Sequence, residues 1–516
     1  TSDLANAIDA AVADGVDIIN YSVGSSQIEV TAPDDIALMA ATKAGVFSVV
    51  AAGNDGPNLG TVGSPAGGPW VMTAAASTRD GRTKSEAMEV LTPMTIAGLY
   101  KALEANFTPE LSAAGPIEGS LVLVDDETDT ASDACEALTN SDDVSGKIAY
   151  IQRGNCDFDV KLANAEDAGA VAAVVYNIAG DPIVMNGDEG SVNIPAVMIG
   201  QADGNLILAE LDRLPDVTVL LDKDLFIDEE DSGNRMASFS SRGPGPALNV
   251  VKTDVTAPGV NILAGFTPDA VTATQGENFA YLSGTSMSTP HVAGVAALLL
   301  QANPDWSPSV VKSALMTTAR QDLTTSDGET PANPFDFGSG HIVPNDAANP
   351  GLVYDVSDDE YDAFACGIAS PGASTERCTE LSQAGFSFAG EDLNQPSIAI
   401  AHLSGEQTVR RTVTNVSDET ATYTAEIVPP SGMQVSVTPT SLTVAPGASA
   451  SYDVTFTFES GRLDLWRFGS LTWTSNERDI YSVLAIRPAA VAAPAEITTL
   501  GGSGSLSFSV QFGYTG

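Results

Sequence analysis

The fold of this chain is decided by one stretch of small and hydroxyl-bearing residues, Ser283-Gly284-Thr285-Ser286-Met287-Ser288-Thr289-Pro290-His291-Val292-Ala293-Gly294. The small residues favour a tight turn with Ser286 at its apex, and an Ala-rich helix is expected to follow through Leu300. This order exposes the Ser286 hydroxyl and places its backbone N–H at a helix N-terminus, where partial positive charge favours an anion. Pro290 fits near the helix start, because N–H groups of the first turn have no helical partner. An oxyanion that develops there would be stabilised without rearrangement of the protein.

A second stretch, Ala51-Ala52-Gly53-Asn54-Asp55-Gly56-Pro57, offers another donor to the same anion. The Asn54 side chain can donate an amide N–H, and Gly53 lets a substrate backbone approach closely. The alternatives are that Asn54 only tolerates the angles of an Asn-Asp-Gly turn and that Ser286 only caps a helix. The two stretches together favour the anion-binding interpretation.

Helical and strand-like patterns alternate in the first part of the chain. Leu4, Ile8 and Val12 share one face of a predicted helix, and the apolar run over 16–22 predicts a strand that ends in Ser22-Val23-Gly24. A second helix is expected over 35–44 and a second strand over 46–52. This alternation implies a parallel sheet, whose chemistry lies beyond the carboxyl ends of its strands. Those ends are Ser22-Val23-Gly24 and Gly53-Asn54.

Two changes of pattern divide the rest of the chain. From about residue 86 to 225, short strands and one helix over 158–168 predict a compact α/β unit, and the earlier pattern resumes at 237–244. From about Asp392, two-residue alternation predicts an antiparallel sandwich. The expected domains are 1–85 and 226–390 for one α/β domain, 86–225 for an insertion, 391–489 for the sandwich, and 490–516 for a linker with the start of a truncated further domain.

The charge balance limits the partners. The chain has 67 acidic and 22 basic residues, a formal net charge of −45, so its surface would repel nucleic acid and anionic membranes. We expect neither as a partner. An acidic surface favours solubility in an extracellular or saline setting. The acidic loop over 125–133 is expected to be a solvated face, with structural calcium as the alternative, and no run has the spacing of an EF-hand.

The four cysteines form two local pairs. Cys135 lies near Cys156, and Cys366 lies near Cys378, without the spacing of a metal site. Two disulfides in an oxidising compartment are the expected arrangement, although four cysteines allow three pairings.

The serine and asparagine stretches resemble the nucleophile and oxyanion signatures of subtilases, the subtilisin-like serine proteases. Residues 240–244 (SSRGP) and 256–259 (TAPG) resemble the motifs that flank them. The resemblance implies that Ser286 is the nucleophile and Asn54 the oxyanion donor. It also implies a set of substrate-binding residues: Ser22, Val23 and Gly24 as a strand beside the substrate backbone, Ala52 and Gly53 as a pocket wall, and Gly284 and Thr285 before the nucleophile.

The other parts of the chain resemble domains found in larger subtilases. The insertion resembles a protease-associated domain through GKIA at 146–149, RGNCDF at 153–158 and the run at 165–170. The C-terminal sandwich resembles the fibronectin III-like domain that follows the catalytic domain in these proteases, including those of plants.

One departure from the family concerns the partners of the serine. Subtilases carry their triad in the order Asp, His, Ser. This chain has three histidines, His291 in the serine helix, His341 in a predicted loop and His402 in the sandwich, and none has the His-Gly-Thr setting of the family. No Asp-Thr-Gly or Asp-Ser-Gly stands on an early strand either. We therefore expect the catalytic domain to be incomplete here, with both partners upstream of Thr1.

Two functions follow from these observations. The first is a secreted endopeptidase that cuts protein or peptide substrates through an acyl-enzyme on Ser286 without a cofactor. The Asp and His would be supplied by a missing N-terminal segment. That segment could be a separate chain. A serine without its base is a weak nucleophile, so the chain alone should be nearly inactive. The second is an inert fragment that binds polypeptides or serves as a scaffold. The small wall residues predict a pocket for an apolar or aromatic side chain.

Overall fold

The computed structural model describes residues 2–127, 130, 132–188, 190–213, 216–231, 233–268, 278–492 and 510–512. It divides into two units, one comprising Thr1–Arg79, Asn234–Ile262 and Leu282–Gly516, the other Asp80–Gly233 and Leu263–Tyr281. The second unit is wider than the insertion expected over 86–225. Most of the linker and further domain predicted over 490–516 lies outside the described residues.

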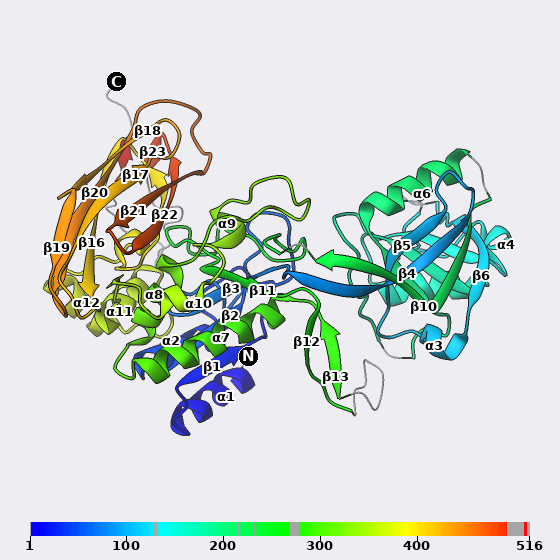
Figure 1. Cartoon of the computed structure of the whole chain (residues 1–516), viewed down its shortest axis with the longest axis horizontal. Helices are drawn as coiled ribbons and strands as arrows, with labels where there is room; N and C mark the ends of the chain where they lie inside the picture. Colours follow the sequence, from blue (N-terminus) through cyan, green and yellow to red (C-terminus); the bar gives the residue numbers. More distant parts are fainter. Residues whose placement is uncertain are drawn as a thin grey trace, which may run out of the picture. The chain divides into compact units, whose positions relative to one another are not determined.

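A four-stranded parallel sheet forms the centre of the first unit (Figure 1). Its order is β1 (Ile18–Tyr21), β2 (Phe47–Ala51), β3 (Met72–Ser77) and β11 (Val255–Pro258). Every adjacent pair is parallel. The predicted parallel α/β fold is therefore confirmed.

Helices cover both faces of this sheet. Val49 packs in one core cluster with Val292, Ala296 and Leu299 of helix α7 (Thr285–Ala302). Its neighbour Val50 packs instead in a cluster with α1 (Ser2–Ala13) and α2 (Pro33–Lys43). Successive strand residues point to opposite faces, so α7 lies on one face and the two N-terminal helices lie on the other.

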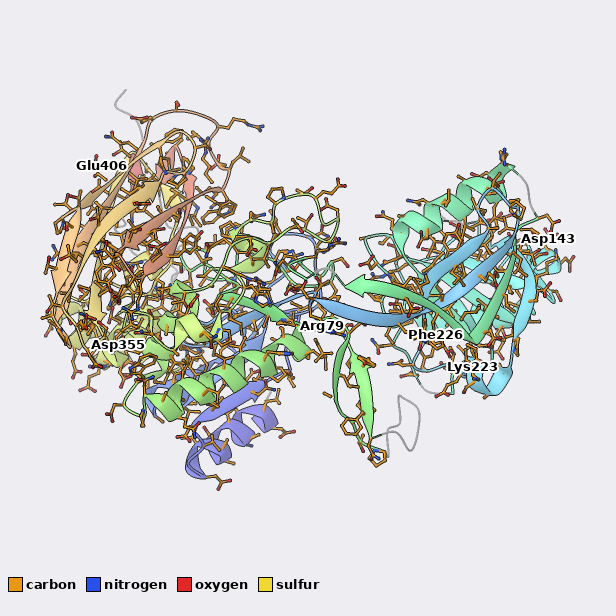
Figure 2. All side chains as sticks on the ribbon, in the orientation of Figure 1. Arg79, Asp143, Lys223, Phe226, Asp355 and Glu406 are labelled. Atoms are coloured by element: carbon orange, nitrogen blue, oxygen red, sulfur yellow. A yellow bond between two sulfur atoms is a disulfide. The ribbon has the colours of Figure 1, made fainter. Side chains whose placement is uncertain are left out.

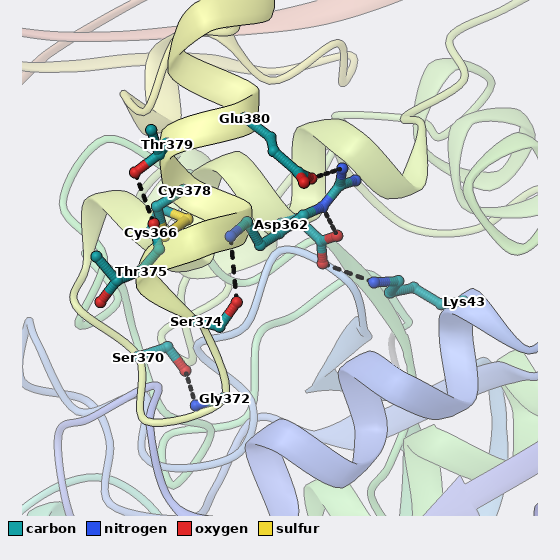
Figure 3. The surroundings of a disulfide bond; sticks show 11 residues. Lys43, Asp362, Cys366, Ser370, Gly372, Ser374, Thr375, Cys378, Thr379 and Glu380 are labelled. Carbon is teal, nitrogen blue, oxygen red and sulfur yellow. Dashed lines mark hydrogen bonds and ion pairs between the residues drawn. A yellow bond between two sulfur atoms is a disulfide. The ribbon is translucent and has the colours of Figure 1, made fainter.

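Shorter helices follow α7. They are α8 (Pro308–Thr317), α9 (Pro334–Phe337), α10 (Pro344–Ala347), α11 (Asp358–Gly367), α12 (Thr375–Ala384) and the 3₁₀ helix η1 (Gly390–Asp392). The disulfide Cys366–Cys378 joins α11 to α12, as predicted (Figure 3). Beside it, the Asp362 carboxylate lies 2.6 Å from Lys43 of α2 and 3.0 Å from the guanidinium of Arg377. These contacts tie the helical pair to the sheet domain.

The C-terminal part is the predicted all-β sandwich. One sheet has the order β14-β16-β20-β18 and the other β15-β22-β21-β17-β19. The strands are β14 (Leu352–Val353), β15 (Ile398–Leu403), β16 (Glu406–Asn415), β17 (Ala421–Val428), β18 (Met433–Thr438), β19 (Ser441–Val444), β20 (Ser449–Phe458), β21 (Arg467–Thr474) and β22 (Asp479–Pro488). The short strands β23 (Val491–Ala492) and β24 (Gln511–Phe512) pair with each other.

Alternation of side chains along the strands builds the sandwich core. Trp473 and Tyr452 are buried with their rings 4.9 Å apart, whereas Glu406 (labelled in Figure 2) lies on an exposed face and accepts a hydrogen bond from Thr457. Two details differ from the prediction. The pair β15–β22 is parallel, and β14, which precedes the expected boundary at 391, pairs with β16. Both depend on long-range pairing that periodicity cannot reveal.

The second unit contains a closed barrel with the strand order β10-β4-β5-β9-β8-β7-β6. Its elements are β4 (Gly81–Thr92), β5 (Gly98–Glu104), α3 (Leu111–Ala114), β6 (Ile117–Leu123), α4 (Ser141–Val144), β7 (Ile148–Gln152), α5 (Phe158–Asp167), β8 (Ala172–Tyr176), β9 (Ala196–Ile199), α6 (Gln201–Arg213) and β10 (Thr218–Asp231). The hairpin β12 (Ile262–Gly265) and β13 (Phe279–Leu282) lies largely within its second segment. Cys135 is bonded to Cys156, as predicted. Among the residues described, no helix combines the length and apolarity needed to cross a bilayer.

A buried cluster of two lysines and one aspartate lies beneath the parallel sheet. The Asp254 carboxylate is 2.6 Å from the ammonium of Lys252 and 3.1 Å from that of Lys312, and all three side chains are at most 5% exposed. Both ammonium groups also donate to the carbonyl of Val71. Two cations share one anion, and burial lowers the pKa of Lys252 to about 7.

We predict that Asp254→Asn destabilises the protein by about 3–5 kcal/mol, because it leaves two buried lysines without a counter-charge. Lys252→Met should cost less, because it leaves a one-to-one pair. Lysine in the unfolded chain titrates near 10.4, so the unfolded state binds more protons between about pH 7 and 10. The free energy of unfolding should therefore rise with pH over that range. Urea denaturation at pH 7, 8.5 and 10 measures this rise, and an undiminished rise in Lys252→Met would contradict the assignment.

Candidate active site

Ser286 lies where predicted, at the start of α7. Gly284 is the N-cap and Thr285 the first helical residue, so the Ser286 N–H is among the helix N–H groups without an intrahelical partner. The expectation that Pro290 lies in the first helical turn was wrong. Pro290 lies five residues after Thr285, beyond the first turn, where a proline removes the hydrogen bond to the carbonyl four residues earlier. That carbonyl belongs to Ser286.

Ser22, the residue after β1, supplies a hydrogen bond in place of the one that Pro290 removes. Ser22 Oγ donates to the Ser286 carbonyl at 3.0 Å, and Ser286 Oγ donates back to the Ser22 carbonyl at 3.3 Å. The Asn20 side chain donates in turn to Ser22 Oγ at 3.1 Å. The nucleophile candidate is therefore fixed to the carboxyl end of a parallel strand, the edge at which α/β sheets place their chemistry.

Asn54 is oriented by the residue before Ser286. Its Oδ1 accepts hydrogen bonds from the backbone N and the hydroxyl of Thr285, each at 3.0 Å. The Thr285 hydroxyl accepts in turn from the Gly53 N–H at 3.2 Å. With Oδ1 occupied, Nδ2 is the side of the amide that remains to donate. Thr285, expected to bind substrate, is only 1% exposed and acts by holding Asn54.

The two predicted oxyanion donors bracket one small space beside Gly284. A Cβ atom at Gly284 would lie 3.6 Å from Asn54 Nδ2 and 3.6 Å from the Ser286 backbone N. A point shared by two N–H donors at the N-terminus of a helix favours negative charge. The structure thus brings together Ser286, Asn54 and Gly284 as the sequence analysis expected.

Ser241 holds the loop that carries Asn54, a role that the sequence analysis did not find. Its backbone N donates to the Gly53 carbonyl at 2.9 Å, and its Oγ accepts from the Asp55 N–H at 3.2 Å. Gly53 has φ +105°, and a Cβ there would lie 2.7 Å from Ser241 Oγ. Glycine at 53 is therefore required by the backbone as well as by any approach of substrate. Ser241 belongs to the SSRGP run, but the sequence alone could not predict that this run lies against the Asn54 loop.

The predicted substrate strand lies on the surface beside Ser286. Val23 is 50% exposed, and within the described part of the chain no hydrogen bond uses the main-chain groups of Val23 or Gly24. Those groups are available to an extended peptide. The following residue, Ser25, pairs with Ser64 and so anchors the segment. Ala52, expected in the pocket wall, is only 1% exposed.

None of the histidines, all of which are described, is hydrogen-bonded to Ser286. The ring of His291 contacts the carbonyl four residues earlier at 2.9 Å, and that of His341 contacts the carbonyl of the next residue at 3.1 Å. Burial lowers the pKa of His341. His402, in the sandwich, is 2.7 Å from the Arg487 guanidinium, and burial followed by that charge lowers its pKa.

A buried carboxyl group supports the substrate strand from below. Asp35 is fully buried at the start of α2, and its Oδ2 accepts from Ser64 Oγ at 2.7 Å and from the Ala32 N–H at 3.2 Å. Burial, together with the smaller effect of the nearby Asp34 carboxylate, raises the pKa of Asp35 to about 7. Asp35 thus fixes Ser64, which anchors Ser25.

The solvated face expected for the acidic loop over 125–133, with structural calcium as the alternative, stays a prediction. Residues 128, 129 and 131 of that loop lie outside the described residues. Elsewhere in the described ranges, no three His, Cys, Asp or Glu side chains come together as a metal cage.

Comparisons with known proteins match two parts of this chain to families. The family model described as Subtilase family matches residues 1–340, and the one described as Fibronectin type-III domain matches residues 392–486. Subtilisin-like protease SBT1.6 of Arabidopsis thaliana is 36% identical, over 92% of this chain and 64% of the relative. Subtilisin-like protease SBT3.9 of the same plant is 34% identical, over 94% of this chain and 63% of the relative. The chain thus spans less than two thirds of these relatives.

We predict that Asp35→Asn removes a pH dependence of stability. Aspartate in the unfolded chain titrates near 3.9, so between about pH 4 and 7 the folded state binds more protons. The free energy of unfolding of the parent protein should fall across that range by about 3 kcal/mol, while that of Asp35→Asn should stay flatter. Thermal or urea unfolding at pH 4.5, 6 and 8 measures the difference. The exposed Asp17→Asn is the control, and equal slopes in all three proteins would contradict the prediction.

Proposed function

This chain belongs to the subtilase family of serine proteases, and we propose that it carries the nucleophile and oxyanion site of an endopeptidase acting through a Ser286 acyl-enzyme. The observation that carries the proposal is the space beside Gly284, which lies 3.6 Å from both Asn54 Nδ2 and the Ser286 N. A carbonyl oxygen that becomes negative between the two nitrogens, nearer to each than this point, would receive two hydrogen bonds from groups already in place.

The reaction assigns one task to each part of the site. An extended substrate pairs with the free main-chain groups of Val23 and Gly24, which brings its scissile carbonyl to Ser286. Ser286 Oγ loses its proton to a base and attacks the carbonyl carbon, and the oxyanion forms between the two donors. Collapse breaks the C–N bond, the amine leaves with the proton, and an ester remains on Ser286. Water then hydrolyses the ester and frees the serine.

The base comes from outside residues 1–516, because the three histidines of this sequence all have other contacts and none reaches Ser286. Two features support a docking place next to the serine. Strand β1 is at the edge of the parallel sheet, and Leu298 on α7 is 63% exposed. A segment that pairs with β1 and covers this face of α7 would bring a histidine and its carboxylate to the site. Without it, the chain should be nearly inactive.

Setting and substrates follow from the surface. Two disulfides and a net charge of −45 support a secreted protein in an oxidising compartment. Val23 and Ile28 are exposed apolar side chains on the segment that follows Ser22, and Leu59 is one on the segment that follows Asn54. They support peptides with apolar or aromatic side chains before the cut. No cofactor enters the reaction.

A second candidate is the inert polypeptide-binding scaffold. The observation in its favour is that the Ser286 hydroxyl is bonded to the Ser22 carbonyl and not to a base. A carbonyl cannot take up the proton that attack requires. The two candidates differ in whether Ser286 reacts in the full-length protein.

Labelling by a fluorophosphonate probe distinguishes them. The full-length protein should be labelled, Ser286→Ala should not, and Asn54→Ala should react more slowly. The rate of labelling of Asn54→Ala should fall by a factor of about 10² to 10³. This is the loss of catalytic rate found on removal of one such donor in subtilisin, a member of the same family. Asn58→Ala, in the same exposed loop, is the control. An unlabelled full-length protein would favour the scaffold, and equal rates for Asn54→Ala and Asn58→Ala would refute the oxyanion role.

Gly284→Ala tests the position of the oxyanion directly. The added methyl has ordinary contact distances to the protein, so folding should be retained, but it occupies the space between the two donors. We expect kcat against a peptide substrate to fall about 10²-fold or more. Gly294→Ala on the same helix, where a Cβ meets nothing within 4 Å, is the matched control and should leave kcat unchanged. Similar kcat values for both variants would place the oxyanion elsewhere.

A further inference from the structure

A cavity of about 530 Å³ lies in the second unit, apart from the serine site. It lies beside the carboxyl ends of two parallel strands, because Arg153 follows β7 and Asn177, bonded to Arg153, follows β8. Helix α5 begins at its wall with Phe158. Ligands of α/β units bind at such strand ends, and the volume fits a short peptide.

Arg153 is the distinctive group of this cavity. Its guanidinium donates to Asn177 Oδ1 at 3.0 Å and lies 6.0 Å from the centre of the Phe158 ring. Burial lowers its pKa, but an arginine side chain keeps its charge in proteins. Within the described ranges, no carboxylate forms an ion pair with it, although the chain has 67 acidic residues for 22 basic ones. A half-buried guanidinium left in this state has donors free for a ligand.

The rest of the lining has the opposite charge. Asp157, Asp159 and Asp188 contribute to the walls, and Cys156 is held by its disulfide to Cys135. None of these aspartates is paired with Arg153. The cavity therefore offers one cationic group and several anionic groups at separate places on a polar wall.

We propose that this cavity binds the C-terminal end of a short peptide, with the free carboxylate on Arg153 and a basic side chain or ammonium group facing the aspartates. The guanidinium fork can donate two parallel hydrogen bonds to the two oxygens of a carboxylate. A C-terminal amide has one oxygen and no charge, so it cannot accept both. The choice of peptide rests on the proposed function, because every cut by an endopeptidase creates a new C-terminal carboxylate. The site would thus retain cleaved ends through the carboxylate that each cut creates.

Calorimetry on the full-length Ser286→Ala protein tests the proposal without cleavage of the probe. The probes are the tripeptide alanyl-lysyl-alanine as free acid and as C-terminal amide. The free acid should bind at least about tenfold more tightly than the amide. Arg153→Met should abolish this difference, and Arg153→Lys, which keeps the charge without the fork, should retain part of it. Arg213→Met, an exposed arginine of the same unit, is the matched control and should change nothing.

Equal binding of acid and amide, or no binding of either, would overturn the proposal. Acetate that competes as well as the tripeptide would also overturn it, because the site would then be a simple anion site. Should Arg153→Met fail to fold, Asp188→Asn provides a second variant, which should weaken the lysine tripeptide but not trialanine. Because these measurements need no reactive serine, failure here leaves the labelling of Ser286 to decide the proposed function separately.

Discussion

The site depends on a pair of hydrogen bonds between two residues that are 264 positions apart in sequence, Ser22 and Ser286. Pro290 makes this pair necessary, because it removes the helical donor of the Ser286 carbonyl. Ser22 supplies the replacement from the end of β1. The start of α7 is thereby fixed to the sheet at the residue proposed as the nucleophile, and a proline that would weaken an ordinary helix becomes part of the geometry.

The proposed oxyanion site must favour a negative charge in a chain whose net charge is −45. Distance resolves this conflict. Salt screens exposed charges beyond about 10 Å, whereas the amide of Asn54 and the N–H of Ser286 would act on an anion placed directly between them. Their effect therefore depends on fixed orientation, which Thr285 provides for the Asn54 side chain and Ser241 for its loop. Neither partner contributes charge. Both prevent the donors from turning away.

The sequence was sufficient for the fold class. Strand and helix periods predicted the parallel sheet, and the two motifs predicted Ser286 and Asn54, which the fold places near one another. It was insufficient wherever a role depends on which distant segment lies alongside. Ser241 appeared only as part of a flanking motif, and Thr285 as a residue that contacts substrate. The pairing of β14 with the sandwich was likewise invisible, because two residues of strand carry no period.

The few basic residues show how such an acidic chain uses its cations. Lys312, Arg242 and Arg411 are buried and donate to backbone carbonyls, so each supplies hydrogen bonds that irregular segments lack. Their positive charge is thus used inside the fold, which leaves the surface still more acidic. Arg153 differs from them, because the hydrogen bond it donates goes to the Asn177 side chain, and its guanidinium lines an open cavity. Among the described residues, its guanidinium donates to no backbone carbonyl and pairs with no carboxylate, and this supports the proposed anionic ligand.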